Sequence, residues 1–323
     1  MQEFTGREYL LIDIANHVGM DRETWNTRIN WAQDSNTQLE SLDAEAKDPV
    51  LYRKAVRALR SCDRGEPIGY PMSLDATASG LQILAILCGC EATASNVNLM
   101  PTGNREDIYT KVGDAMGVDR SVVKKPIMTT YYGSKKQPAE IFGEGTTELL
   151  LFYALLHTFT PGAMQLMPEL QSFWNPDKLE HVWTMPDKHV IRAKVMQHVD
   201  KKIEIDEFNH ATFTHTTLVN APQDKGLSLA ANITHSIDAY IVRQMLRRAK
   251  RDKFELATIH DSFWAHPNNM NKVRENYVQI LAEIARSNLL QDILDQLQPG
   301  WGKINKLNNS LDTRILQSDY ALS

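Results

Sequence analysis

Two short β-prone runs, each ending in an aspartate, lie far apart in a sequence otherwise dominated by helical patterns. The first run, "YPMSLD", ends at Asp75 and leads through small residues into an apolar segment that ends near residue 87. The second, residues 256–259, ends in His260 and Asp261 and returns at once to aromatic residues. Long helical segments combined with a few strands that are not consecutive in sequence predict a helix-rich α+β fold.

The remaining segments read mainly as helices. Helical patterns cover residues 6–63, 104–117, 118–135, 225–251 and 270–295, and residues 146–182 contain apolar helices interrupted by Pro161, Pro168 and Pro176. Between them, residues 183–219 alternate between β-prone and polar positions. Such alternation predicts a long hairpin.

Size and composition fit a soluble globular protein, because 42% of the 323 residues are apolar and 23% are charged. No signal peptide is visible, and the longest apolar stretch, residues 81–90, is too short to span a bilayer. The three cysteines, two of them in the pattern Cys88-x-Cys90, provide neither a disulfide framework nor a four-ligand zinc set. We therefore expect a protein of the reducing cytoplasm with no membrane partner.

Positive charge is concentrated in two runs although the net charge is −5. Residues 243–253 carry six bases and one acid, and residues 119–136 carry five bases and one acid. Clustered bases on an acidic protein indicate a local site for a polyanion. The alternative is that both runs are solvated helix faces.

Asp261 raises the question of what compensates a carboxylate within a strand region. A salt bridge or a tight turn would be one answer, because an unpaired buried carboxylate is costly. The other answer is a metal ion shared with Asp75, which lies 186 positions earlier and could meet Asp261 only through tertiary folding. Two carboxylates at adjacent strand ends suit Mg²⁺ bound jointly with substrate phosphates, as in two-metal phosphoryl chemistry.

A third candidate feature is a stripe of residues spaced four apart within 117–135. Residues at this spacing stay on one face of a helix. The stripe begins with two bases and ends with an aromatic ring, and Gly133 follows it; its members are Arg120, Lys124, Met128 and Tyr132. Bases for phosphates and a ring for the sugar and base suit a nucleoside triphosphate. An ordinary amphipathic helix with a basic rim is the alternative.

Three segments resemble, in this order, motifs A, B and C of the single-subunit DNA-dependent RNA polymerases of phages and mitochondria. They are "SLDATASGLQ", "RSVVKKPIMTTYYGSK" and "IHDSF". Other segments resemble the family in the same order, so that the resemblance covers nearly the whole chain: "GREYLLIDIAN", "VNLMPTGNREDIYTKV", "VWTMPDKHVI", "NITHSID" and "RILQSDYALS".

The resemblance implies roles for particular residues. Asp75 and Asp261 match the catalytic aspartates that hold two Mg²⁺ ions, and Lys124 matches the catalytic lysine that faces the triphosphate. The remaining matches are Arg120 one turn before that lysine, Tyr132 in ribose selection, His235 near the sugar 2′-hydroxyl, Tyr109 on the same side, His260 before the motif C aspartate, and Gly80 and Gln82 after motif A. Without its place in "THS", His235 would more often be a structural histidine.

The fold implied by the resemblance is a right-hand polymerase palm with an inserted, reduced fingers module. Residues 1–98 would form the first palm portion with motif A, residues 99–231 the fingers with motif B and the hairpin, and residues 232–323 the second palm portion with motif C and a C-terminal foot. The hairpin region resembles in position the family loop that reads promoter DNA.

Departures from the family pattern lead to a hypothesis about subunits. Pro126 stands within motif B, where it must kink or tighten a helix, and Leu11 replaces a lysine of some relatives. Motif A arrives at residue 75 with no T/D-x-x-G-R motif before it, so an N-terminal promoter domain and a thumb are expected to be absent. We therefore expect the catalytic subunit of a split, heterodimeric phage-type RNA polymerase.

The expected partners follow from this hypothesis. They are template DNA, RNA product, ribonucleoside triphosphates, a second polymerase subunit with the thumb and early palm, and an accessory protein that recognises promoters or binds single-stranded DNA. The expected location is the cytoplasm of a phage-infected bacterium.

Two alternatives remain. A family A DNA polymerase shares motif B, but that class usually has a glutamate shortly after its motif A aspartate and reads His-Asp-Glu in motif C. Here motif A continues with Ala, Thr, Ala, Ser and Gly, and motif C reads His-Asp-Ser. A non-catalytic nucleic-acid-binding subunit is the second alternative, although both aspartates, Lys124 and Tyr132 are present.

Overall fold

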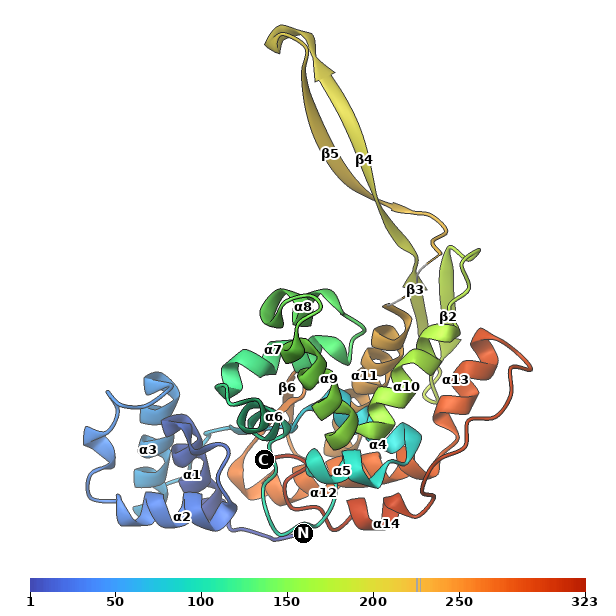
Figure 1. Ribbon diagram of the computed structural model, residues 1–323. Coiled ribbons are helices and arrows are strands. Elements are labelled where there is room, and N and C mark those ends of the chain that lie inside the picture. The colour runs from blue at the N-terminus through green and yellow to red at the C-terminus, as the bar shows by residue number, and fades with distance from the viewer. Residues whose placement is uncertain (225, 227) are drawn as a thin grey trace.

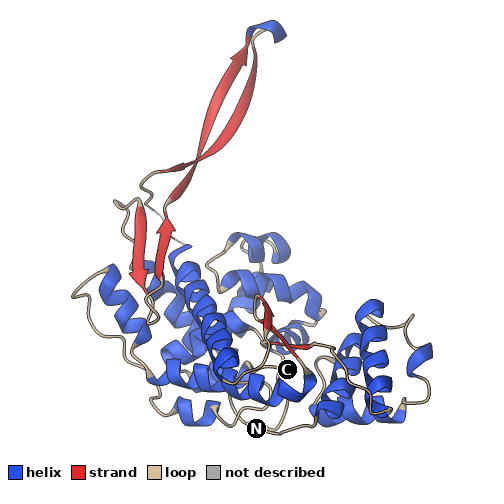
Figure 2. Ribbon diagram, turned by 180° about the vertical axis from the view of Figure 1, so that it is seen from behind, coloured by secondary structure: helices blue, strands red, loops and turns tan. Residues whose placement is uncertain are grey.

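The computed structural model describes residues 1–224, 226 and 228–323 and has the predicted helix-rich α+β fold. Figure 1 shows a helical body, a group of N-terminal helices beside it and one long hairpin that projects far from it. Figure 2 shows the same arrangement from behind, with only a small sheet inside the helical body. That sheet carries both predicted aspartates.

The N-terminal group contains α1 (Gly6–Ala15), the π-helical turn η1 (Asn16–Met20), α2 (Trp25–Asp34), η2 (Leu39–Ser41) and α3 (Pro49–Asp63). Local sequence fixes where these helices begin. Thr5 and Glu8 form a capping box at α1, and the Thr24 side chain caps α2. Asp48 caps α3, whose first residue is a proline. Residues 6–63 are thus mostly helical, as predicted.

Helices α4 to α10 build much of the body. They are α4 (Ser79–Cys88), α5 (Glu91–Asn96), α6 (Ile108–Met116), α7 (Arg120–Thr130), α8 (Lys136–Phe142), α9 (Thr147–Phe159) and α10 (Pro161–Ser172). The predicted helix over residues 118–135 is shorter than expected, because α7 ends at Thr130 and a turn through Gly133 leads to α8. Pro126 lies inside α7, and the Thr130 hydroxyl donates to the Pro126 carbonyl at 2.8 Å.

The small central sheet has the strand order β1 (Met72–Asp75), β7 (Ser262–Ala265) and β6 (Ala257–Ile259). Both pairings are antiparallel, and Asp75 stands opposite Ser262. The expectation of a buried strand before Asp261 is wrong for β6, which is a short, largely exposed edge strand. Its neighbour β7 is buried at Phe263 and Ala265.

The predicted single long hairpin is instead two consecutive hairpins. β2 (Glu180–Thr184) pairs with β3 (Val190–Lys194), and β4 (Met196–Ile205) pairs with β5 (Ala211–Asn220) through the turn η3 (Asp206–Phe208). The second hairpin is the exposed arm in Figure 1. One residue, Val195, separates β3 from β4, and this is too little for a sequence pattern to separate two hairpins.

The C-terminal third packs two long helices against α4. These are α11 (Ser228–Arg251) and α12 (Met270–Arg286), which α13 (Leu289–Leu297) and α14 (Leu311–Ile315) follow, with η4 (Pro267–Asn269) before α12. The predicted start of α11 at residue 225 lies outside the described residues. The predicted helix over 270–295 is broken between Arg286 and Leu289.

The core runs through the body along α4, whose residues 81–88 are all buried. Cys88 and Cys90 are buried free thiols and Cys62 is also free, as expected for a chain without a disulfide framework. Among the described residues, no single helix has the length and apolar character to cross a membrane, although α9 and α10 together pass that test across a bend of 104°.

Candidate active site

The fold brings the two predicted aspartates to neighbouring strand ends. Asp75 is the last residue of β1, and Asp261 lies in the two-residue turn between β6 and β7. The Ala76 amide donates to the Asp261 carbonyl at 3.1 Å, which joins the two segments. His260 has a φ of 54°, so the turn places a non-glycine residue in the left-handed region. The tight turn that Asp261 suggested is therefore present.

The electrostatics of this pair favour a cation. Burial of the carboxylate is the main cause that raises the pKa of Asp75. A hydrogen bond from Ser262 lowers this pKa, and the nearby Asp261 charge raises it. Asp75 nevertheless remains accessible to water in the pocket. Among the described residues neither aspartate forms an ion pair, so a salt bridge does not compensate Asp261.

A pocket of about 670 Å³ is lined by this pair and by the predicted stripe of residues on α7. Its lining includes both aspartates and the aromatic ring of Tyr109, together with Arg120, Lys124, Met128 and Tyr132. The helical spacing predicted that the four residues of the stripe face the same side. All four line this pocket, although Tyr132 lies two residues beyond the end of α7. Carboxylates, bases and aromatic rings therefore meet in one cavity.

The two bases of the stripe have different surroundings. Arg120 is half-buried, pairs with Asp107 at 2.7 Å and lies over the Tyr109 ring at 5.0 Å from its centroid. Asp107 also caps α6 by accepting from the Tyr109 amide at 2.9 Å. Lys124 is exposed to the pocket and forms no ion pair with any described residue. Its ammonium group is thus free to meet a phosphate.

Tyr132, His235 and Gly80 form a contact at the edge of the pocket. The Tyr132 and His235 rings lie 4.7 Å apart between centroids, and a Cβ at Gly80 would lie 3.0 Å from the Tyr132 hydroxyl oxygen. Burial raises the pKa of Tyr132 and lowers that of His235. The imidazole is therefore neutral at pH 7, where it can donate or accept a hydrogen bond.

Two predicted residues do not line this pocket. His235 reaches it only through Tyr132, and Gly133, with a φ of 88°, lies at a separate pocket of about 110 Å³. Of the other positions that the resemblance named, His260 and Gly80 line the main pocket. Gln82 is buried behind it, where its amide donates to the Val97 carbonyl at 3.0 Å and to the Ala321 carbonyl at 2.9 Å.

One wall of the pocket consists of residues that were not predicted from the sequence. Residues of the N-terminal helices and of the loop before α6 line it: Asp13, His17, Asp21, Lys47, Asp48, Arg105 and Asp107. Asp13 is buried and accepts from the Tyr70 hydroxyl at 2.6 Å, and His17 lies 3.5 Å from it. Asp13, Arg105 and Asp107 lie in segments that resemble the family, but no local pattern selected these seven residues, because they meet the aspartates only through tertiary folding.

Asp238 is a second omission, and here the sequence offered a signal. It stands three residues after His235 on α11, almost one helical turn away. Burial and the Asp261 charge raise the pKa of Asp238 to about 6, while His260 opposes the shift. The negative charge of Asp261 therefore acts on a third carboxylate, that of Asp238.

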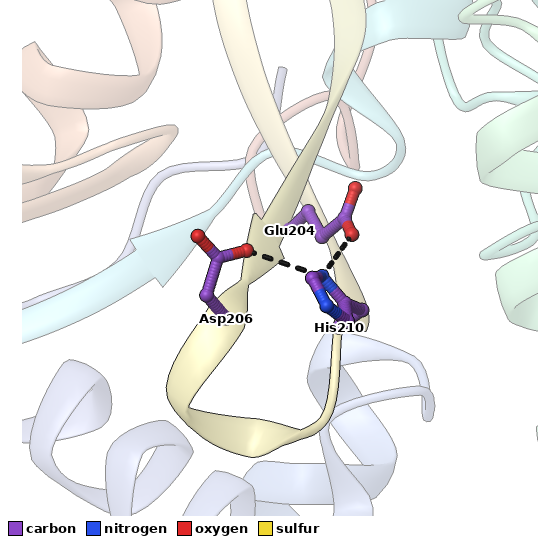
Figure 3. Close-up of side chains that lie close together, drawn as sticks. All are labelled: Glu204, Asp206 and His210. Carbon is purple, nitrogen blue, oxygen red and sulfur yellow. Dashed lines mark ion pairs between the residues drawn. The ribbon is translucent and has the colours of Figure 1, made fainter.

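The donor set at the strand ends fits a hard divalent cation. Its ligands would be carboxylate oxygens, which Mg²⁺ prefers, and neither carboxylate forms an ion pair with a described residue. Another cluster with metal-ligand chemistry lies at the tip of the β4–β5 hairpin, where Figure 3 shows Glu204, Asp206 and His210. There His210 Nδ1 lies 2.7 Å from Glu204 and 3.2 Å from Asp206, so ion pairing explains the cluster.

Four of the six bases in the run at the end of α11 form ion pairs with three acids. Arg243 and Arg247 pair with Asp187 at 2.6 Å and 3.6 Å. Arg248 pairs with Glu283 at 2.6 Å, and Arg251 pairs with Asp252 at 2.7 Å. For this run, the solvated helix face describes the structure better than a polyanion site.

Comparison with known families identifies the chain. The model of the DNA-dependent RNA polymerase family matches residues 2–117 and 166–320. These ranges include both strand-end aspartates and His235. The stretch between them, which contains α7 and the stripe, is not matched, so the likeness of motif B rests on the residues quoted for it.

Curated relatives agree with the family model. The mitochondrial DNA-directed RNA polymerase of Schizosaccharomyces pombe is 23% identical over 91% of this chain and 31% of its own length. The DNA-directed RNA polymerase of Pseudomonas phage phiKMV is 22% identical over 87% of this chain and 44% of its own. The human mitochondrial enzyme is 21% identical over 89% of this chain and 28% of its own. The chain thus spans between about a quarter and under half of these relatives, and it belongs to the DNA-dependent RNA polymerase family of phages and mitochondria.

Proposed function

We propose that this chain carries the catalytic site for DNA-templated RNA synthesis from ribonucleoside triphosphates. The observation that supports this most directly is the single pocket in which Asp75, Asp261, Lys124 and Tyr132 meet from separate parts of the chain. The relatives named DNA-directed RNA polymerase support the reaction class.

In this proposal the carboxylates of Asp75 and Asp261 would hold two Mg²⁺ ions. Bound there, the ions would supply activation of an RNA 3′-hydroxyl and neutralisation of charge on the transferred and leaving phosphates. The β1–β7 pairing fixes the two carboxylates relative to each other before substrate binds. Preorganisation of this kind lowers the reorganisation needed in the transition state.

Lys124 would bind the triphosphate and stabilise the charge that develops on pyrophosphate as it leaves. Its free ammonium group in the pocket suits both tasks, and it would also give a proton to the leaving group. Arg120 would act one turn earlier on the same phosphates. Its pair with Asp107 and its stacking on Tyr109 hold the guanidinium in a fixed position.

Tyr132, His235 and Tyr109 would select the sugar. The Tyr132 hydroxyl would offer a hydrogen bond to a ribose 2′-hydroxyl, the His235 ring would support Tyr132 from behind, and Gly80 leaves the room that the tyrosine needs. Met128 would border the base in the pocket, and Gly133 would shape the turn after α7 that carries Tyr132. A site built to hydrogen-bond a hydroxyl rejects the analogue that lacks it.

The polymerase architecture also remains a proposal. Residues 1–98 and 232–323 would be the two palm portions, the second with a C-terminal foot, and residues 99–231 would be a reduced fingers module. The β1–β7 pairing between distant segments supports a palm that is split in sequence. The second boundary falls inside α11, so the division there would be one of function along a continuous helix.

We further propose that this chain acts together with a thumb and an early palm segment, supplied by a second polymerase chain. The relatives have further segments beyond the part that this chain matches. The exposed β4–β5 arm would contact DNA, and an accessory protein or a single-stranded template would replace autonomous promoter recognition. Protection of duplex promoter DNA by this chain alone in a footprint would contradict the last point.

Primer extension tests the function. The chain, with any polymerase chain that co-purifies with it, is given an RNA primer on a DNA template with either ribo- or deoxynucleotides. We expect Mg²⁺-dependent extension with ribonucleotides. Preference for deoxynucleotides would identify the DNA polymerase alternative, and template binding without extension would identify the non-catalytic subunit.

A further inference from the structure

The pocket is lined by a basic side chain from the N-terminal segment to which neither the sequence motifs nor the relatives assign a role. The basic Lys and Arg residues that line it in the described chain are Lys47, Arg105, Arg120 and Lys124. Arg120 is paired with Asp107, and Arg105 is mostly enclosed and donates to the Ser323 hydroxyl at 3.2 Å. This leaves two ammonium groups open to the cavity, Lys124 and Lys47.

The backbone at Lys47 is held in place. The neighbouring Ala46 is buried, and the Asp48 amide donates to the His17 carbonyl at 3.2 Å, which ties this loop to η1. The Asp48 side chain caps α3 through the Leu51 amide at 3.2 Å. Lys47 is therefore presented from a fixed position between a core residue and a helix cap, while its side chain is 69% exposed.

The side chain of Lys47 is only loosely engaged. Its Nζ atom lies 3.7 Å from Asp21 Oδ1, longer than a charge-assisted hydrogen bond. That Oδ1 atom is buried and has no hydrogen-bond partner among the described residues. Lys47 also lines the same pocket as Asp75 and Asp261. A cation held this loosely can move to an anionic ligand.

We propose that Lys47 binds the phosphates of the incoming nucleoside triphosphate in the pocket that it shares with Lys124, and that Asp21 acts as a positioning residue for its ammonium group. The proposal rests on the proposed function, since it names a further phosphate ligand of the same site. Figure 1 shows α1–α3 as a group apart from α6 and α7, so the two lysines would approach the phosphates from different parts of the molecule. A flexible point charge suits this task.

The number of phosphates on the ligand provides the test. Affinities for ATP and AMP are measured with Mg²⁺ on the chain and any polymerase chain that co-purifies with it, using wild type, Lys47→Ala, Lys47→Arg and Lys124→Ala. We expect Lys47→Ala to weaken ATP binding about tenfold, or about 1.4 kcal/mol, with AMP binding unchanged. Lys47→Arg should retain most of the affinity. The matched control is Lys54→Ala, because Lys54 is an exposed lysine on α3 outside the pocket.

A labelling experiment makes the conclusion independent of any loss of folding in a variant. An acyl phosphate of ATP transfers its acyl group to a lysine amine within reach and releases ATP. In the wild-type protein we expect mass spectrometry to find acylated Lys47 and Lys124, with both protected by excess ATP, and no protected label on Lys54. In Asp21→Asn, labelling of Lys47 should fall while that of Lys124 is unchanged.

The outcomes separate this inference from the function on which it rests. If Lys124→Ala weakens ATP binding but Lys47→Ala behaves like Lys54→Ala and Lys47 is not labelled, the role of Lys47 is wrong and the polymerase site stands. If wild type binds ATP no better than AMP and Lys124→Ala has no effect, both are wrong.

Discussion

Gly80 shows how one missing side chain shapes the sugar side of the pocket. The resemblance named it only as a small residue after motif A, and the structure gives the reason, since a Cβ there would lie 3.0 Å from the Tyr132 hydroxyl oxygen. A contact this short requires the tyrosine to shift by a few tenths of an ångström. A residue proposed to select ribose would then be misplaced.

We expect Gly80→Ala to reduce discrimination between ribo- and deoxynucleotides about tenfold, the scale of one displaced hydrogen bond. The measurement is the ratio of kcat/KM values for the two nucleotides. In a Tyr132→Phe background the hydroxyl is gone, so Gly80→Ala should add little. The control is Gly69→Ala, where a Cβ meets nothing within 4 Å. Equal effects of Gly80→Ala in both backgrounds would contradict this account.

Single residues were predictable where chain-local rules apply. Asp75 and Asp261 follow β-prone runs, and the stripe from Arg120 to Tyr132 follows from helical periodicity, so the sequence could nominate them. Asp21 and Lys47 lie in segments without such a pattern and reach the pocket only because α1–α3 pack beside the sheet. Asp238 lies about one helical turn from His235, so helical periodicity could have identified it. It was not selected because α11 carries many other polar residues.

At the scale of elements, the start of α10 packs closely on the turn between α4 and α5. A Cβ at Gly162 would lie 2.2 Å from Cys90 Cβ and 2.8 Å from the Sγ atoms of Cys88 and Cys90. Both cysteines are buried, so the turn has little room to move. Glycine is needed here for close approach and not for backbone conformation.

Gly162→Ala is therefore expected to lower the free energy of unfolding by about 1–3 kcal/mol, the usual cost of overpacking, despite the better helix propensity of alanine. Denaturant unfolding measures it. Gly69→Ala again serves as the control. A variant as stable as wild type would show that α10 can shift away from the two cysteines.

Asp187 fastens the β2–β3 turn to α11. Arg243 donates to both of its carboxylate oxygens, at 2.6 Å and 3.1 Å, and Arg247 lies 3.6 Å away. The hydrogen bonds from Arg243 hold the pKa of Asp187 below its usual value. The unfolded chain therefore binds the proton more readily than the folded one, and this stabilisation is present above the ordinary pKa of about 3.9 and is lost as the pH falls through the lower folded value.

For Asp187→Asn we expect a loss of about 2 kcal/mol in unfolding free energy at pH 7, typical of hydrogen bonds to charged groups. The difference from wild type should shrink as the pH is lowered from 5 to 3. Thermal or denaturant unfolding over this pH range is the measurement, with the exposed Asp177→Asn as control. A constant difference at every pH would mean that shape, and not charge, holds the turn.

Element types were more predictable than element limits. The central strands and most helices follow from local pattern, whereas the end of α7, the break after α12 and the division into two hairpins depend on what packs around them. Near-continuous β-prone sequence cannot show where one hairpin stops, because only a single residue separates β3 from β4.

The molecule has a net charge of −5, but several bases of the α7–α8 region are exposed. At the end of α11 the arginines pair with nearby acids, whereas Lys124, Lys125 and Lys135 form no ion pair with a described residue. Composition suggested two equal cationic runs, and only tertiary structure shows that one is partly neutralised locally. Nucleic-acid phosphates should therefore meet the α7–α8 region.

The salt dependence of template binding tests this asymmetry. Lys125→Gln with Lys135→Gln should reduce the slope of log affinity against log salt by about 1–2, since each phosphate contact contributes about one unit. Arg248→Gln with Arg251→Gln should leave the slope unchanged, because both arginines are already paired. A larger change from the arginine pair would place the nucleic acid on α11 instead.

The most direct measurement of the central claim is single-turnover addition of one ribonucleotide by wild type, Asp75→Asn, Asp261→Asn and Asp114→Asn, the last an exposed aspartate on α6 outside the pocket. We expect each of the first two substitutions to reduce the rate by about 1,000-fold or more, as expected for groups that stabilise transition-state charge. Asp114→Asn should retain the wild-type rate. Near-wild-type addition by Asp75→Asn or Asp261→Asn, with the fold intact, would contradict the assignment of the reaction to this pair of strand ends.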